Sequence, residues 1–125
     1  MYNTPMQLIY QNTVKNSITL EGIGLHTGKP SRIRIVPSDL DQKIIFKRVD
    51  LRSNNLIEAN FKNVSSAKLC TTLENEHGVK VSTVEHLLAA LYISEIDSAV
   101  IEINSEEVPI MDGSARDFLQ ALKKS

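Results

Sequence analysis

Two adjacent side chains, Glu85 and His86, are the residues of this sequence best suited to chemistry. They lie near the start of a predicted helix, in the segment STVEHLLAAL that spans Ser82–Leu91. A carboxylate can take a proton from water, and a neutral imidazole is a common zinc ligand. Successive helical residues point about 100° apart, so both side chains can border one site without occupying the same position.

Both residues also have a purely structural interpretation. Ser82 and Glu85 have the spacing of a capping box, in which the glutamate returns to the amide of the N-cap residue. A single histidine on an apolar helix more often belongs to the core than to a metal site. Helical spacing alone therefore favours a capping Glu85 and a core His86.

A zinc site needs more ligands than this pair provides. Catalytic zinc binds three protein ligands and a water molecule. The other nitrogen and sulfur donors are His26, His77 and Cys70, and position 90, four residues after His86, is alanine. The residue spacing therefore gives only weak support to a metal site.

The glycine-rich segment Gly22–Pro30 is not a phosphate-binding loop by its pattern. A P-loop requires Ser or Thr after its Gly-Lys pair, where this sequence has Pro30, and Thr27 replaces the third glycine of a dinucleotide fingerprint. A strand is expected next, so the helix dipole that would hold phosphate is missing. His26 in this turn is expected to be structural or to contribute to a cleft.

Hydrophobic periodicity predicts the elements that position these residues. Alternation with a period of two predicts strands at Ile18–Leu20 and Ile33–Ile35. Short apolar segments predict further strands at Ile44–Phe46, Leu56–Phe61 and Ala99–Ile103, and a hairpin of Leu69–Leu73 and Val79–Val81 is predicted around the turn at residues 74–78. The period then changes to 3.6 in a helix that begins at a Ser82 or Thr83 cap and ends at about Ile93. A final helix is expected after Ser114, with Asp117 at its capping-box position. This order indicates an α+β fold.

The first of these helices is apolar on two sides. One side consists of Val84, Leu87, Leu88 and Leu91, and the other consists of His86, Ala89, Ala90 and Ile93. A helix that is apolar on two sides is expected to be covered on two sides. We therefore expect one side to pack on the sheet and the other to face a partner outside these 125 residues.

The composition is that of an ordinary globular domain. The chain has 125 residues, of which 42% are hydrophobic and 23% charged, and its net charge of −1 excludes the basic surface of a nucleic-acid-binding protein. One cysteine excludes an internal disulfide and fits a reducing compartment. There is neither a signal-peptide pattern nor an apolar run of about 18 residues, so we expect a cytoplasmic protein without a membrane segment.

Four segments follow one another in a distinctive order: Gly22–Lys29, Leu69–Thr71, Ser82–Leu91 and Ile103–Ser114. In combination they resemble the N-terminal half of the UDP-3-O-acyl-N-acetylglucosamine deacetylases, zinc enzymes of lipid A biosynthesis. The resemblance implies a two-layer α+β sandwich of a mostly antiparallel sheet packed with helices, similar to domain 2 of ribosomal protein S5. Residues 16–125 would form one of two such domains, preceded by a loose arm at residues 1–15.

The same resemblance implies roles for individual residues. Glu85 would be the general base and His86 a ligand of Zn²⁺, which polarises the N-acetyl carbonyl and activates its bound water. Glu85 would take a proton from that water, and the substrate would break down to acetate and a free amine. Leu69, Cys70 and Thr71 would bind the substrate beside its acyl-glucosamine end. Asp112, like His26, is expected to be structural or to line the cleft.

The remaining parts of the family's site do not occur in this sequence. Its other zinc ligands lie in a His-Lys-x-x-x-Asp motif of a second, C-terminal domain, and no His-Lys pair is present here. We therefore expect a complete site for zinc and for UDP-3-O-acyl-N-acetylglucosamine only with that domain, in cis or in trans. The alternative is a truncated, non-catalytic binding or scaffold module that associates through the exposed helix face.

Overall fold

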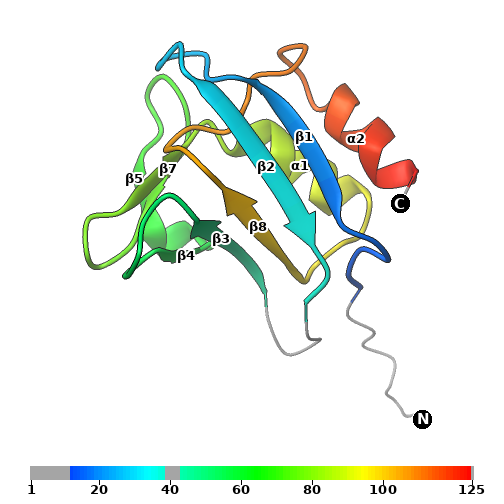
Figure 1. The fold of residues 1–125 in the computed structure, drawn as a ribbon, viewed down its shortest axis with the longest axis horizontal. Helices are drawn as coiled ribbons and strands as arrows, with labels where there is room; N and C mark the ends of the chain where they lie inside the picture. Colours follow the sequence, from blue (N-terminus) through cyan, green and yellow to red (C-terminus); the bar gives the residue numbers. More distant parts are fainter. Residues whose placement is uncertain (1–11, 39–42, 125) are drawn as a thin grey trace, which may run out of the picture.

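The computed structural model describes residues 12–38 and 43–124, which form an α+β fold with two sheets (Figure 1). The larger sheet has the strand order β1-β2-β8-β3-β4. Its strands are β1 (Ile18–Ile23), β2 (Pro30–Val36), β8 (Ala99–Ile103), β3 (Ile44–Arg48) and β4 (Leu56–Glu58). All neighbours are antiparallel except β3 and β8, so this sheet is mixed.

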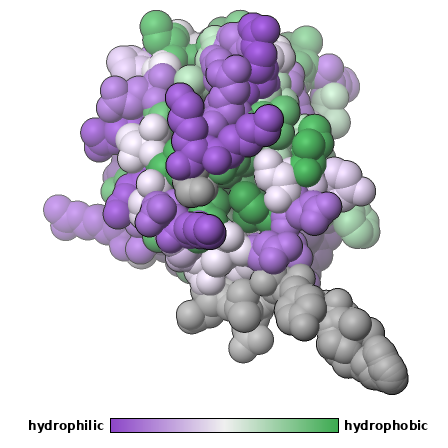
Figure 2. Space-filling view, turned by 90° about the vertical axis from the view of Figure 1, so that its right-hand side faces the viewer, coloured by the Kyte–Doolittle hydropathy of each residue, from purple (hydrophilic) through white to green (hydrophobic). Residues whose placement is uncertain are grey.

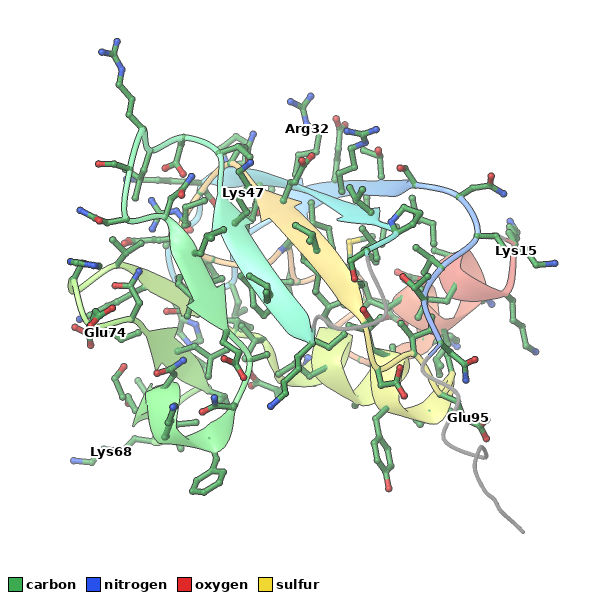
Figure 3. The ribbon with its side chains drawn as sticks, turned by 90° about the horizontal axis from the view of Figure 1, so that it is seen from below. Lys15, Arg32, Lys47, Lys68, Glu74 and Glu95 are labelled. Carbon is green, nitrogen blue, oxygen red and sulfur yellow. The ribbon has the colours of Figure 1, made fainter. Side chains whose placement is uncertain are left out.

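Alternation along β2 separates the two faces of the sheet. Ile33 and Ile35 are fully buried and pair with Ile103 and Ile101 of β8. Arg32, which precedes Ile33 in β2, is exposed and projects from the face away from the helices (Figure 3). A period of two in the sequence thus places the apolar residues on one face.

Two α-helices cover that apolar face (Figures 1 and 3). They are α1 (Glu85–Ile93) and α2 (Arg116–Lys123), which pack against each other. Phe118 of α2 and Leu87 of α1 are among the most buried side chains and belong to the same core as Phe46. No helix in the described ranges is both long and apolar enough to cross a membrane.

A smaller sheet of three short strands leads into α1. It contains β5 (Val64–Ser66), β6 (Thr72–Glu74) and β7 (Lys80–Ser82), and the 3-10 helix η1 (Phe61–Asn63) precedes it. The predicted hairpin between β6 and β7 is confirmed, with Gly78 at a φ of 80°. The sequence analysis did not predict β5, because its three residues are exposed and lack alternation.

Arg48 joins the two sheets. Its guanidinium donates to the Lys80 carbonyl at 2.8 Å and to both carboxylate oxygens of Asp50 at 2.9 and 2.7 Å. The hydrogen bond from Arg48 holds the pKa of Asp50 below its ordinary value. The buried Arg48 thus has a hydrogen bond from each of its three guanidinium nitrogens.

We expect Arg48→Met to lower the free energy of unfolding by about 2 kcal/mol, because the substitution leaves Asp50 and the Lys80 carbonyl without their donor. Urea unfolding followed by circular dichroism measures the change. Arg52→Met is the matched control, since Arg52 is exposed. Equal losses in the two variants would contradict a specific role for Arg48.

Several details differ from the sequence prediction. The strand expected at Leu56–Phe61 ends at Glu58, and the strand expected at Leu69–Leu73 begins only at Thr72. Ala90, assigned to the second side of α1, is fully buried in the core, which narrows that side to His86, Ala89 and Ile93. Helix α2 begins at Arg116 after an N-cap at Ala115. The Ser114 hydroxyl accepts from the Arg116 amide at 3.2 Å, as expected of a capping serine, but the Ser114 amide donates to Asp112 and not to Asp117, so the predicted capping box does not form. The predicted N-terminal arm lies outside the described residues up to residue 11, but its Val14 is only 3% exposed and packs in the core.

Candidate functional site

The candidate site lies where β7 turns into α1. The amide of Ser82 donates to the carbonyl of Glu106 at 2.7 Å, which makes Ser82 part of a strand and not a helix cap. The N-cap is Val84, and Glu85 is the first helical residue. The capping box expected for Ser82 and Glu85 is therefore wrong, and the Glu85 carboxylate is not used to cap α1.

Thr71 forms hydrogen bonds with the Glu85 carboxylate and with the backbone of Thr83 at this turn. Its amide donates to Oε1 of Glu85 at 3.2 Å, and its carbonyl accepts from the amide of Thr83 at 2.9 Å. Of the three residues predicted to bind substrate, Thr71 thus lies against the candidate base. Leu69 is 86% exposed, and Cys70 is half-buried with its Sγ 3.9 Å from Oγ1 of Thr72.

His86 follows Glu85 and is half-buried. Within residues 12–38 and 43–124, no group hydrogen-bonds its imidazole, unlike a satisfied core histidine. The same ranges contain no group of three or more His, Cys, Asp or Glu side chains placed to hold a metal ion. His77 instead lies in the exposed β6–β7 turn beside Glu76. The described donors thus fit one position of a zinc site, at His86, and do not fit a complete site.

Glu107 is a central residue of this region that the sequence analysis did not single out. Its carboxylate is fully buried and accepts from Nδ1 of His26 at 2.9 Å, from the amide of Thr27 at 2.8 Å and from the hydroxyl of Thr83. These bonds join the glycine-rich turn to the residue two positions before Glu85. Ile101 and Ile103 are buried positions of β8, and the same period of two places residue 107 on the buried side of the chain. This periodicity could have predicted that Glu107 is buried.

Hydrogen bonds keep Glu107 ionised despite its burial. Burial alone raises the pKa of a carboxyl group, but donation from Thr83, Thr27 and His26 outweighs that effect and lowers the pKa from 4.5 to about 2. An ionised carboxylate only accepts hydrogen bonds, so Nδ1 of His26 must carry the proton in their shared bond.

We expect Glu107 to make the fold acid-sensitive. Its folded pKa lies below the unfolded value, so its contribution is complete above pH 4.5 and is lost as the pH falls towards about 2. A shift of this size corresponds to about 3 kcal/mol. Urea unfolding between pH 7 and pH 2 measures the loss, and Glu107→Gln should flatten this part of the profile. An equally steep profile in that variant would contradict the assignment.

Asp112 has a local role in the turn before α2. Its carboxylate accepts from the amide and hydroxyl of Ser114, at 3.1 and 2.9 Å, and from Nε of Arg116 at 3.1 Å. The Ser114 hydroxyl, followed by its amide and Arg116, lowers the pKa of Asp112. The hydrogen bonds that the Asp112 carboxylate accepts all come from residues 114 and 116, within this turn.

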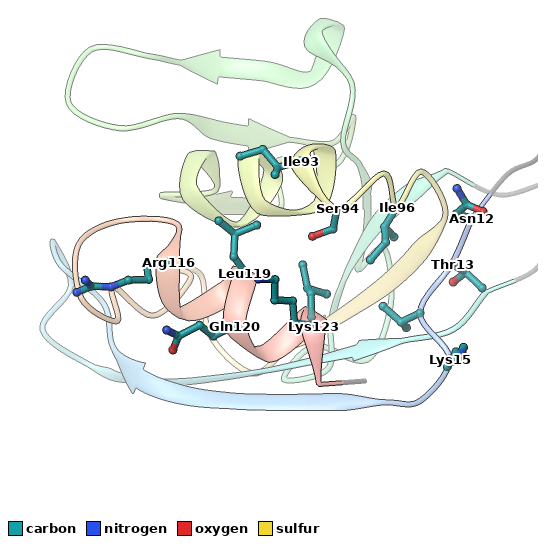
Figure 4. Close-up of a pocket in the computed structure, with 12 residues that line it drawn as sticks. Asn12, Thr13, Lys15, Ile93, Ser94, Ile96, Arg116, Leu119, Gln120 and Lys123 are labelled. Carbon is teal, nitrogen blue, oxygen red and sulfur yellow. The ribbon is translucent and has the colours of Figure 1, made fainter.

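A surface cavity lies at the other end of α1. It has a volume of about 790 Å³ and is lined by the C-terminal end of α1, by α2 and by residues 12–15 (Figure 4). Figure 2 views the side of the molecule that carries α2, where hydrophobic side chains reach the surface among hydrophilic ones. Ile93 borders this cavity, whereas Glu85 and His86 do not. The cavity is therefore separate from the candidate site.

Comparison with known proteins identifies the family of this chain. The family described as UDP-3-O-acyl N-acetylglycosamine deacetylase matches residues 11–125. Curated relatives of that name are 42% identical in Wigglesworthia glossinidia brevipalpis and 43% identical in Geotalea uraniireducens, each over 94% of this chain. A third, in Saccharophagus degradans, is 48% identical over 90% of this chain. The chain spans only 37–40% of the length of these relatives. It belongs to the UDP-3-O-acyl N-acetylglycosamine deacetylase family.

Proposed function

We propose that this chain provides the general base, Glu85, and one zinc ligand, His86, of a deacetylase that acts on UDP-3-O-acyl-N-acetylglucosamine. The observation that carries the proposal is their position as the first two residues of α1. One carboxylate oxygen of Glu85 is oriented by the Thr71 amide, and the His86 imidazole has no hydrogen-bonding partner in the part of the chain described here. The Glu85 carboxylate and the His86 imidazole can therefore each bind a further group, such as a water molecule or a metal ion.

The proposed reaction is hydrolysis of the N-acetyl amide. Bound zinc would supply a Lewis acid for the carbonyl and for water, with His86 among its ligands. Glu85 would accept the proton of the attacking water and pass a proton to the leaving amine, so that acetate and a free amino group result. Thr71 would keep the Glu85 carboxylate in place and, with Leu69 and Cys70, border the substrate.

The rest of the site would come from a second domain. An exposed strip on α1, comprising Ala89, Tyr92 and Ile93, supports this inference, since Tyr92 is 85% and Ile93 61% exposed. We propose that residues 16–125 form one domain of the ribosomal protein S5 domain 2 type, and that α1 faces the second domain in a cytoplasmic enzyme. The exposed strip equally suits the non-catalytic alternative, in which it binds another protein.

A chimera separates the two functions. The segment is joined to the remaining part of the Saccharophagus degradans relative, with which it shares 48% identity. We expect the chimera to bind zinc and release acetate from UDP-3-O-acyl-N-acetylglucosamine, and the 125-residue chain alone to do neither. A folded, zinc-loaded chimera without deacetylation would contradict the proposed function and favour the binding module.

A further inference from the structure

We propose that Glu107 is a positioning residue, which holds His26 as its Nδ1–H tautomer and fixes Thr83 at the entrance to α1. Through Thr83, Glu107 would also position Glu85, and this part of the inference rests on the proposed function. Glu107 is fully buried, yet all of its recorded carboxylate partners are donors from two turns that are distant in sequence. Such an arrangement connects the turns more tightly than apolar packing would.

The first connection determines the state of His26. Its amide and Nδ1 both donate to Glu107, at 3.0 and 2.9 Å, so the imidazole is held by two points. With the proton on Nδ1, the neutral ring keeps the lone pair on Nε2. The His26 side chain is 39% exposed, and therefore Glu107 presents a defined acceptor at the surface of the glycine-rich turn.

The second connection stabilises an unfavourable backbone conformation. Thr83 has a φ of 60°, a left-handed value that is costly for a β-branched residue. Its hydroxyl donates to Glu107, and its amide donates to the Thr71 carbonyl, so both ends of the residue are held. Conformations of this kind persist when their surroundings over-determine them. Because Glu85 is two residues further on and also bonds Thr71, release of Thr83 would displace the candidate base.

The tautomer can be tested on the chain itself, without activity or metal. Nitrogen NMR of ¹⁵N-histidine-labelled protein at about pH 9, where an ordinary imidazole is neutral, distinguishes the two tautomers. We expect His26 to show a protonated Nδ1 and an unprotonated Nε2. A protonated Nε2 would overturn the assignment.

The positioning role can be tested in the active chimera. Thr83→Val keeps the shape of the side chain and removes the hydroxyl, and we expect kcat to fall about tenfold to 100-fold with KM and zinc content nearly unchanged. Thr83→Ser restores the donor and should recover most of the loss. Asn55→Ala, which removes two hydrogen bonds in the β3–β4 loop, should lower Tm without changing kcat.

The outcomes separate the two proposals. Unchanged kcat in a folded Thr83→Val chimera, or no recovery in Thr83→Ser, would overturn the positioning role while leaving the deacetylase function intact. An inactive wild-type chimera would overturn the proposed function and, with it, the control of Glu85. The tautomer result for His26 would then still decide whether Glu107 holds the imidazole of the glycine-rich turn.

Discussion

Replacing Glu85 by alanine in the complete deacetylase should lower kcat by about 10²–10⁴-fold while zinc stays bound, because this change removes the proton acceptor and no metal ligand. The Thr71 amide loses its carboxylate partner as well, which adds only about 1 kcal/mol to the cost in stability. Turnover is measured as acetate release, and zinc is measured by elemental analysis of the same preparation. Glu85→Gln keeps an acceptor for Thr71 and should be equally inactive.

The neighbouring substitution provides the matched control. His86→Ala should lose zinc and activity together, since it removes one ligand from a site that has few. The two variants change adjacent residues in one helical turn, so a general loss of α1 structure would affect both alike. Equal zinc contents in Glu85→Ala and His86→Ala would show that the roles of base and ligand are wrongly assigned.

Much of the framework around these residues follows from periodicity. Alternation of apolar residues correctly predicts β1 and β2, and the short apolar segments correctly predict β3 and β8. The 3.6-residue period likewise predicts α1 and α2. Ala90 was assigned to the wrong side because a small residue is compatible with either side of a helix.

The details of the site depend on contacts between distant segments, which local patterns do not contain. Ser82 and Glu85 have capping-box spacing, but Ser82 pairs with Glu106 and Glu85 with Thr71. Glutamate is usually exposed, so the residue type gives no reason to place Glu107 in the core. Its burial is favourable only because donors from the turns around residues 26 and 83 bind its carboxylate. The roles of Glu85 and His86 came from the resemblance of four segments, since their spacing favoured structural roles.

The largest effect on stability is expected from Gly24→Ala, at about 3 kcal/mol. A Cβ at this position would lie 2.4 Å from Oε1 of Glu107 and 2.4 Å from Oγ1 of Thr27. Both atoms are held by hydrogen bonds: Oε1 accepts from the Thr27 amide within a carboxylate that also binds His26 and Thr83, and Oγ1 of Thr27 accepts from the Lys29 amide at 3.2 Å. Thermal and urea unfolding of the variant measure the loss.

Gly28→Ala distinguishes this clash from an effect of backbone conformation. Gly28 lies in the same turn with a φ of 67°, and a Cβ there would meet no atom within 4 Å. Its replacement should cost only about 1 kcal/mol, from the left-handed conformation alone. If Gly24→Ala is no worse than Gly28→Ala, the carboxylate of Glu107 can yield to a methyl group. The carboxylate would then not be held rigidly enough to fix Thr83 relative to His26, and the proposed positioning of Glu85 by Glu107 would be contradicted.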